Sequence, residues 1–505
     1  MKTKKTFLNI ITDVIPLIIV SLLGIYKIKL FIQVLGNETL GLYQLFNNLM
    51  IYIAIVDGGL SSALLFSLYK PNTSGDEKKV NALLSAGLKT FSKIGMYVFG
   101  MATILYFLII FLIKDSPFSY WYIVLTFLIF SISSVIEYYF VPYNTLLEVK
   151  EKKYILNLLT QIGQILISVV EIIMLLSGIG FVYILLSHSI IKLIVRVIEV
   201  LLCKKKFPNA DFHFKEKDYS FKKMLGPLVF HKINGLVGSN IDSLIISSML
   251  GLESVAIYSA YNYIINMLKN ILGKISSSMT ALIGNSLETS KEKMYDLYLE
   301  FDTLLFFMAI IICTPLMLSI DGFINMFYEG NIQTSFLIAI SFSLILFTFI
   351  IKMDTNLFVN AAGLYKETKH CAIVDTIVNL VLSLVLVYII GIPGVIIATT
   401  VSVLIAEYIL KTIVVHKNVF KTSSMFYFLK NIKFFVIFVI DLVLGYYIVN
   451  LFSINSLLMW FIFYIIFTFV NMLVIFIIFS LFNETNFIQR FKMLIKKDDM
   501  IDEKM

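Results

Sequence analysis

The sequence predicts an all-α integral membrane protein with about 14 transmembrane helices, and three observations lead to this fold class. Hydrophobic residues make up 59% of the 505 residues, and the mean hydropathy is +0.90. Charged residues make up only 15%, whereas a soluble domain carries roughly a quarter. Stretches such as Ser456 to Asn483 contain no Asp, Glu, Lys or Arg. About twenty apolar residues are enough to cross a bilayer as a helix, so that stretch predicts a membrane span.

Helices are the expected form of every span, because a backbone in lipid must satisfy its own hydrogen bonds. The alternating ten-residue strands of a membrane β-barrel do not occur in the sequence. Apolar segments of sufficient length predict fourteen spans in chain order: 9–34, 41–68, 84–113, 119–143, 154–177, 180–202, 224–249, 255–284, 299–320, 333–358, 370–391, 393–415, 431–450 and 456–482.

The connections between these spans differ in charge in a regular way. Lys114 is the only basic residue on the connections that follow odd-numbered spans, while the termini and the other connections carry most of the 41 Lys and Arg residues. Because basic loops stay in the cytoplasm, both termini of this multi-pass protein are expected there. Membrane topology therefore explains the net charge of +8, and nucleic acid is not expected as a partner.

The chain contains an internal repeat with a shift of about 215 residues. Leu35-Gly36-Asn37-Glu38 aligns with Leu250-Gly251-Leu252-Glu253, and at a shift of 216 Lys150-Glu151 aligns with Lys366-Glu367. The repeat unit has six helices, and an even number preserves direction, so we predict two parallel six-helix repeats plus two C-terminal helices. The expected parts are an N-lobe with spans 1–6 (residues 1–205), a cytoplasmic connector (206–223), a C-lobe with spans 7–12 (224–416), and spans 13–14 with a cytoplasmic tail (417–505).

The region of the second span resembles a known family. Its residues are Gly41-Leu42-Tyr43-Gln44-Leu45-Phe46-Asn47, then Asp57-Gly58-Gly59-Leu60-Ser61-Ser62-Ala63, then Ser67-Leu68-Tyr69-Lys70-Pro71. They are similar to the second helix of bacterial polysaccharide flippases, the O-antigen and capsule repeat-unit exporters of the multidrug/oligosaccharidyl-lipid/polysaccharide (MOP) superfamily. The start of the chain, the six-plus-six plan and the fourteen spans are similar as well. The resemblance covers essentially the whole chain, through loose motifs.

The resemblance implies the V-shaped, two-lobed architecture of MATE-like multidrug exporters and MurJ-like flippases, working by alternating access. It implies a flippase, not an enzyme. The expected substrate is an oligosaccharide on a polyprenyl diphosphate, often undecaprenyl, moved from the inner to the outer leaflet for surface polysaccharide biosynthesis. We expect a monomer in the bacterial cytoplasmic membrane, surrounded by membrane lipids and without a cofactor. A polysaccharide polymerase and glycosyltransferases are candidate partners.

Charged residues within the spans are the candidates for substrate binding. A charge at the centre of a membrane helix costs roughly 2.5–3.5 kcal/mol, so it needs a partner, water or a function. Lys269 lies roughly fifteen residues from either end of its span, too deep for its ammonium group to reach an interface. Ammonium groups suit a compact diphosphate dianion, and salt bridges within the membrane are the alternative. Four lysines are expected to line a cavity between the lobes and bind the headgroup: Lys27, Lys232, Lys269 and Lys274.

Two acids within the spans are candidates for ion coupling or gating, Asp57 on span 2 and Asp242 on span 7. A transporter coupled to protons or sodium needs a buried acid that binds and releases the ion, and structural pairing is the alternative role of both acids. Lys27 and Asp242 are related by the 215-residue shift, so they are expected at equal depth in opposite lobes, where they could pair. The membrane potential is another energy source, since each negative charge moved outward gains ~2.3 kcal/mol per 100 mV.

Other kinds of chemistry find no support in the sequence. Cys203, Cys313 and Cys371 are far apart and lack metal-ligand spacing. Gly273-Lys274-Ile275-Ser276 lacks the earlier glycine of a phosphate-binding loop, since position 268 is Leu268. We therefore expect no metal site, no catalytic residues and no ATP hydrolysis within the chain.

Three other functions stay open. A cation-coupled multidrug exporter of the same superfamily would have acids dominating its cavity and usually twelve spans. A flippase for the peptidoglycan precursor lipid II is not distinguished by the sequence. A membrane sugar polymerase or ligase generally has a large outer loop with catalytic residues, whereas the longest outer loop here is 321–332.

Overall fold

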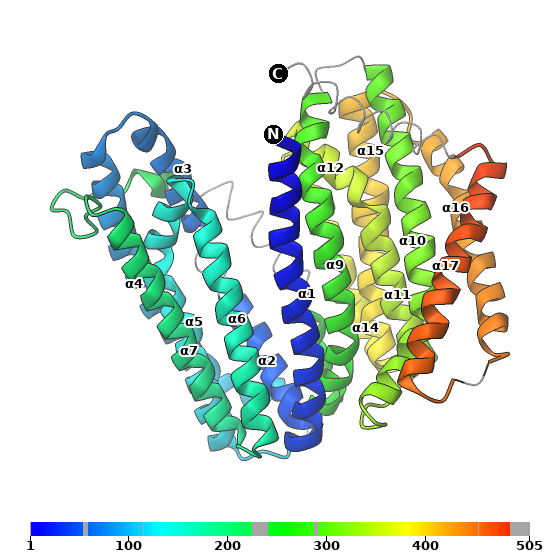
Figure 1. Ribbon diagram of the computed structural model, residues 1–505, viewed down its shortest axis with the longest axis horizontal. Coiled ribbons are helices and arrows are strands. Elements are labelled where there is room, and N and C mark those ends of the chain that lie inside the picture. Colours follow the sequence, from blue (N-terminus) through cyan, green and yellow to red (C-terminus); the bar gives the residue numbers. More distant parts are fainter. Residues whose placement is uncertain are drawn as a thin grey trace. The chain divides into compact units, whose positions relative to one another are not determined.

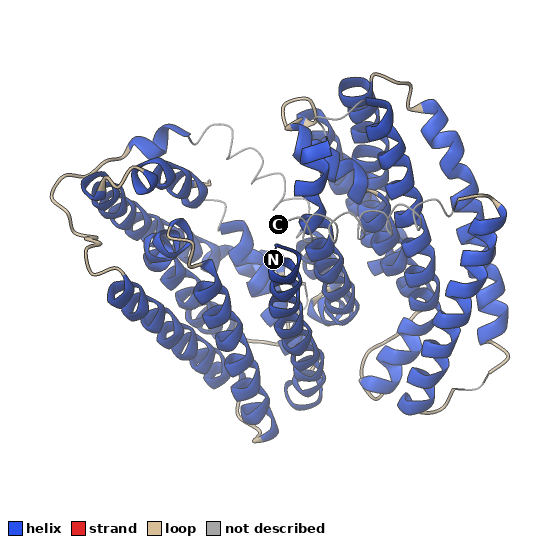
Figure 2. Cartoon of the chain, turned by 45° about the horizontal axis from the view of Figure 1, so that its top comes forward, coloured by secondary structure: helices blue, strands red, loops and turns tan. Residues whose placement is uncertain are grey.

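The computed structural model describes residues 2–53, 59–114, 116–224, 241–286, 291–452 and 454–484. Within these ranges every regular element is a helix (Figure 2), and the predicted all-α fold class is confirmed. The chain divides into two compact units. We call Pro16–Ala256 the N-unit, and Ile257–Met505 together with Met1–Ile15 the C-unit.

The N-unit contains the first helices of the chain, coloured from blue to green in Figure 1. In chain order they are α1 (Lys2–Leu35), α2 (Asn37–Ile53), α3 (Leu60–Thr73), α4 (Glu77–Leu108), η2 (Ile109–Leu112), α5 (Tyr120–Val149), α6 (Lys153–Leu176), α7 (Phe181–Lys206), η3 (Ser220–Met224) and the short helix Ile241–Leu250.

The C-unit contains the remaining helices, although residues 252–256 of α9 belong to the N-unit and residues 2–15 of α1 to the C-unit. In this unit α16 and α17 both pack against α10 (Figure 1). In chain order its helices are α9 (Leu252–Ser286), α10 (Lys291–Phe327), α11 (Phe336–Ile351), α12 (Met353–Ala362), α13 (Lys369–Ile390), α14 (Ile392–Val403), the π-helical segment η4 (Leu404–Leu410), α15 (Lys411–Val415), the π-helical segment η5 (His416–Phe420), α16 (Met425–Val449) and α17 (Leu457–Leu481).

Ten helical stretches in the described ranges are long and apolar enough to cross a membrane, and they coincide with ten of the expected spans. α4 and α9 also exceed the length that a bilayer requires. The other two expected spans, 41–68 and 224–249, include residues outside the described ranges. The protein is therefore a multi-pass membrane protein, and the total of fourteen spans stays a prediction.

Several helices begin at residues that satisfy free backbone N–H groups. The side chain of Asp76 accepts a hydrogen bond from the Lys79 amide at 3.0 Å at the start of α4. Ser119 does the same for α5 and Ser456 for α17. Such caps matter because the first four N–H groups of a helix have no partner within it.

Residues matched by the internal repeat have similar backbone conformations at the junctions between consecutive helices. Gly36 joins α1 to α2 with φ of 85°, and its counterpart Gly251 joins helix Ile241–Leu250 to α9 with φ of 89°. Glycine is favoured at such positive φ values because it has no Cβ. Lys150-Glu151 and Lys366-Glu367 also both fall on turns between helices. Matched positions therefore have matched local structure.

Gly41 marks a close approach between two helix beginnings within the N-unit. A Cβ added at Gly41 on α2 would lie 2.0 Å from the carbonyl oxygen of Leu252, the first residue of α9. No side chain fits at that distance, so glycine permits the contact.

Large apolar side chains divide between interior and outer surface. Phe46 and Phe127 are fully buried in the N-unit, with ring centroids 5.0 Å apart. By contrast, Tyr388 and Ile389 on α13 and Ile465 on α17 are more than half exposed. Exposed apolar surface of this kind is unfavourable in water but fits hydrocarbon.

The segment expected to act as a connector, 206–223, packs on α4. Asn81 donates from Nδ2 to the Asn209 carbonyl at 3.1 Å, and the Asp218 amide donates to the Ala82 carbonyl at 3.2 Å. Phe212 stacks on Tyr143 with ring centroids 4.0 Å apart. The compact units divide after Ala256, some way beyond this segment, and the two-lobe assignment stays a prediction.

Candidate functional site

Lys27, the first of the expected headgroup ligands, belongs to a buried ion-pair cluster in the N-unit. Its Nζ on α1 lies 2.8 Å from Oε2 of Glu171 on α6, whose side chain is only 1% exposed. His188 on α7 bonds the other carboxylate oxygen of Glu171 through Nδ1 at 2.9 Å. The Lys27 ammonium also lies 5.7 Å from the centre of the Tyr43 ring, a cation–π distance. The Lys27 charge is therefore already compensated by Glu171.

A pocket of ≈ 290 Å³, with both polar and apolar lining residues, lies beside this cluster, within the N-unit. His188 is among its lining residues, together with Glu137 on α5 and Lys192 on α7. Lys192 and Arg196 both pair with Glu137, at 3.2 and 2.9 Å. These side chains place basic and acidic groups around a space large enough for water or a small ligand.

Lys269 belongs to a second group of charges, in the C-unit. It is half-buried on α9, with its Nζ 5.8 Å from the centre of the Phe349 ring on α11. The ammonium of Lys352 lies 6.0 Å from the same ring. Lys274, further along α9, is exposed. Phe349 therefore has two ammonium groups around it, only one of which comes from the expected set.

Glu407 forms ion pairs with two basic side chains of this region. Its two carboxylate oxygens pair with Lys352 at 2.6 Å and with Lys411 at 2.7 Å. Asp375 lies within electrostatic reach of both lysines. We call Lys269, Lys352, Lys411 and Glu407 the C-unit lysine cluster. The cluster contains three ammonium groups, and ammonium groups bind anions through charge-assisted hydrogen bonds.

The three other expected site residues are Asp57, Lys232 and Asp242. Asp57 and Lys232 lie outside the described residues. Asp242 is buried on helix Ile241–Leu250, at 4% exposure, and Tyr52 of α2 is within its electrostatic reach. The roles expected for these three residues, and for Lys27, Lys269 and Lys274, stay predictions.

Glu171, Lys352, Glu407 and Lys411 are among the charged residues that the sequence did not assign to a site. A signal for the two acids was available, because a carboxylate inside an apolar span needs a basic partner. The identity of the partner was not readable, since Glu171 and Lys27 are 144 positions apart.

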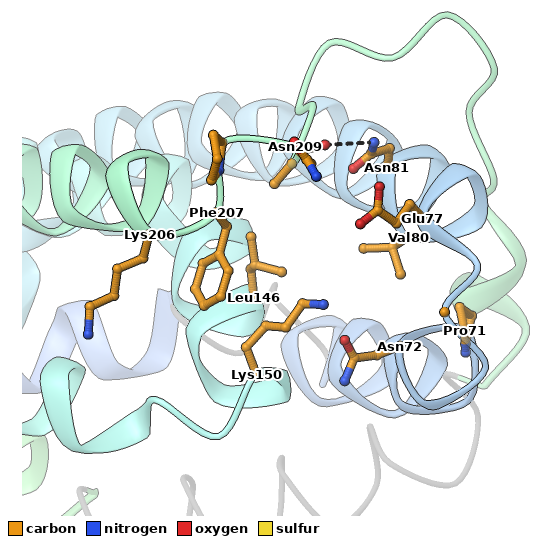
Figure 3. A pocket seen from close by; sticks show the side chains of 13 residues that line it. Pro71, Asn72, Glu77, Val80, Asn81, Leu146, Lys150, Lys206, Phe207 and Asn209 are labelled. Carbon is orange, nitrogen blue, oxygen red and sulfur yellow. Dashed lines mark hydrogen bonds between the residues drawn. The ribbon is translucent and has the colours of Figure 1, made fainter.

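Another pocket, of ≈ 220 Å³, lies where α3, α5 and α7 end and α4 begins (Figure 3). Figure 3 shows the Lys150 side chain extending between Asn72 and Glu77, with Lys206 further off. Its lining mixes polar residues such as Asn72 and Lys150 with apolar ones such as Leu146 and Phe207.

The chain is similar in fold to solved transporters. A lipid II flippase, MurJ, in an inward closed conformation is 18% identical, with a TM-score of 0.72 over 93% of this chain and 98% of that chain. An inward-facing multidrug resistance MATE family transporter of the MOP superfamily is 15% identical, with a TM-score of 0.65 over 77% and 92%. An outward-facing transporter of the same family is 17% identical, with a TM-score of 0.54 over 79% and 93%. No curated protein sequence matches this chain.

The sequence of the chain also matches the model of a protein family. The model described as polysaccharide biosynthesis protein matches residues 6–283, more than half of the chain. The matched range includes the residues from Gly41 to Pro71 on which the likeness to polysaccharide flippases was based, so that expectation is confirmed. The chain belongs to the polysaccharide biosynthesis protein family and has the fold of the MOP superfamily of flippases and transporters.

Proposed function

We propose that the protein is a flippase that moves an oligosaccharide linked to a polyprenyl diphosphate, such as undecaprenyl diphosphate, from the inner to the outer leaflet of the bacterial cytoplasmic membrane. The observation that carries this proposal is the family match over residues 6–283. It occurs in a chain whose described residues include ten apolar helices of membrane-spanning length. The similarity to a protein named as a lipid II flippase supports a lipid-linked substrate. Alternating access is the proposed mechanism.

The diphosphate headgroup is proposed to bind ammonium groups within the membrane. Lys269 is the first candidate, because it lies near the middle of α9 and its ammonium, like that of Lys352, is close to the Phe349 ring. A charge-assisted hydrogen bond from an ammonium to a phosphate oxygen is stronger than a neutral one. Lys27, Lys232 and Lys274 are proposed as further contacts. Lys27 is the weakest of them, since Glu171 competes for its charge.

The proposal also covers ion coupling, the side of the membrane on which the termini lie, and the partner proteins. Asp57 and Asp242 are proposed to take part in ion coupling or gating. Both termini are proposed to be cytoplasmic, on the charge asymmetry of the loops. The protein is proposed to work as a monomer that receives its substrate from glycosyltransferases and delivers it to a polymerase.

Transport in liposomes tests the substrate. Purified protein should move a fluorescent polyprenyl-diphosphate oligosaccharide between leaflets, and Lys269→Ala should slow this movement by about tenfold or more. The estimate follows from the roughly 1.5–3 kcal/mol of a hydrogen bond to a charged group, at 1.4 kcal/mol per tenfold. Lys215→Ala, on the exposed 206–223 segment, is the control and should leave the rate unchanged. Equal rates for both variants would remove Lys269 from the headgroup site.

The same assay separates the alternatives. Lipid II is the second candidate substrate, because the fold similarity to its flippase covers 93% of this chain. Movement of lipid II in preference to a peptide-free oligosaccharide lipid would replace the proposed substrate. Export of cationic dyes, with neither lipid moved, would make the protein a multidrug exporter.

A further inference from the structure

Two acidic side chains of the C-unit are completely buried next to each other. Asp302 on α10 and Asp354 on α12 both have 0% exposure. The hydroxyl of Tyr427 on α16 lies 2.7 Å from Oδ1 of Asp302 and 3.5 Å from Oδ2 of Asp354. A tyrosine hydroxyl has a single hydrogen, so it can donate to only one of the two carboxylates at a time. The pair therefore competes for this hydroxyl hydrogen, while the Thr355 amide donates to Oδ1 of Asp354 at 2.6 Å.

No basic side chain in the described ranges forms an ion pair with either carboxylate. The Lys430 ammonium is within electrostatic reach of Asp302, but it bonds to Thr303 Oγ1 at 3.0 Å and pairs with Glu484 at 3.4 Å. His416 is directed through Nδ1 to its own helix, at the Thr412 carbonyl. α11 and α17, which also pack on α10, contain no acidic or basic residue.

The remaining titratable neighbours are tyrosines, which are neutral at physiological pH. Tyr298 bonds Thr355 at 3.1 Å, and Tyr408 accepts a hydrogen bond from Asn431 at 3.0 Å. Tyr295 packs against His416 near the same place. The described part of the chain thus supplies hydroxyl and amide dipoles, and no ion pair, to the two carboxylates.

Unpartnered oxygens provide an independent observation. Oδ2 of Asp302 and Oδ1 of Asn431 are buried and have no hydrogen-bond partner among the described residues. Asn431 is itself 0% exposed, and its amide nitrogen donates to Oδ1 of Asp302 at 3.3 Å, so it is aimed at the pair. Both orphaned atoms are acceptors. What they lack is a hydrogen to accept or a cation to bind.

We propose that Asp302 and Asp354 form a proton-binding site, in which the pair takes up one proton from water. Its charge then changes from two negative to one negative. Two buried carboxylates side by side without a basic partner are strongly disfavoured when both are ionised. One added proton supplies the missing donor and removes their mutual repulsion. Tyr427 and Asn431 then stabilise the carboxylate that stays ionised.

This site differs from the acids proposed above for ion coupling, and it does not depend on which lipid is moved. It belongs to α10, α12 and α16 and lies within one compact unit. Failure of the transport assay would therefore leave the proton-binding proposal intact, and the reverse also holds.

Infrared spectroscopy tests the proposal on the full-length protein in lipid nanodiscs. A protonated carboxyl group gives a C=O stretching band that an ionised carboxylate lacks. Protein with isotope-labelled aspartate should show such a band at neutral pH, sensitive to exchange of water for deuterium oxide. The Asp302→Asn/Asp354→Asn double variant should lose part of it, whereas Asp76→Asn, at the exposed cap of α4, should not. Identical spectra for the wild type and the double variant would overturn the proposal.

Thermal unfolding gives a second test that does not need the double variant. Asparagine mimics a protonated aspartate, so Asp302→Asn should keep the melting temperature within about 2 °C of the wild type. Asp302→Ala removes the hydrogen bonds to Tyr427 and Asn431 and should lower it by more. A melting temperature for Asp302→Asn as low as for Asp302→Ala would contradict the proposal. Stabilisation of the wild type by sodium but not potassium, lost in Asp302→Asn, would identify a sodium site instead.

Discussion

Glu171 and Glu407 illustrate how single acidic residues are accommodated inside apolar helices. Glu171 is contacted by nitrogens of Lys27 and His188, and Glu407 by nitrogens of Lys352, Lys411 and Asn356. Both oxygens of each carboxylate are therefore occupied. A buried carboxylate is tolerated when it is paired and hydrogen-bonded, and it becomes very costly when one partner is removed.

Replacing Lys27 tests this argument. Lys27→Met keeps a long side chain but removes the ammonium, so Glu171, at 1% exposure, retains only His188. The free energy of unfolding should fall by about 3–5 kcal/mol, as is usual when one member of a buried ion pair is lost. Equilibrium unfolding of the purified protein in one detergent measures the change.

The matching double variant is the control for this prediction. Lys27→Met combined with Glu171→Gln leaves no unpaired buried charge, so most of the lost stability should return. If the single and the double variant are equally unstable, the ion pair is not the cause of the loss.

The site could be predicted from the sequence only as far as local spacing reaches. Glu407 and Lys411 are four residues apart, and residues at that spacing face each other on a helix, so this pair was readable. Lys27 and Glu171 meet only because α1 and α6 pack together. The same holds for Asp302, Asp354 and Tyr427, which come from three helices. One sequence without packing information identifies buried charges but not their partners.

At the scale of the element, apolar length predicted most helices well and their irregularities poorly. The expected span 333–358 is two helices, α11 and α12, which meet at Lys352. The expected span 393–415 contains the π-helical segment Leu404–Leu410, which includes Glu407. Hydropathy is averaged over about 19 residues, so it does not register a break or an extra residue per turn. Both irregularities coincide with charged residues of the C-unit lysine cluster.

Gly41 allows a prediction about helix packing. Gly41→Ala should destabilise the protein by about 1–3 kcal/mol or more, because the added Cβ would lie 2.0 Å from the backbone oxygen of Leu252. Gly100, within α4, is the matched control: no atom lies within 4 Å of its added Cβ. Gly100→Ala should therefore be neutral or stabilising by up to about 1 kcal/mol. Melting curves of both variants measure this contrast, and equal effects would refute the packing argument.

At the scale of the whole molecule, the distribution of basic residues among the loops determines the membrane topology of the chain. Lys114 is the exception on the expected outer side, and the structure gives it a local role. Its backbone amide donates to the Ser247 carbonyl at 3.1 Å, and its ammonium donates to the Met249 carbonyl at 3.3 Å. These carbonyls end helix Ile241–Leu250, where a cation is favourable. The exception therefore does not weaken the asymmetry of the other loops.

Cysteine labelling can test this membrane topology directly, because the three natural thiols are buried and should not react with the label. Cys203, Cys313 and Cys371 are each 0% exposed. A membrane-impermeant maleimide added to intact cells should therefore leave the unsubstituted protein unlabelled, which is the baseline for introduced cysteines.

Five exposed loop positions then report their side of the membrane. Gln333→Cys and Asn455→Cys, which precede α11 and α17, should react in intact cells. Lys215→Cys, Lys366→Cys and Thr422→Cys should react only after the membrane is permeabilised, because basic loops stay in the cytoplasm. Gln333 and Lys366 are the decisive pair, since the broken stretch Phe336–Ala362 separates them. Labelling of both from the same side would mean that this stretch enters and leaves the membrane on one side, and the alternation of all later spans would be reversed.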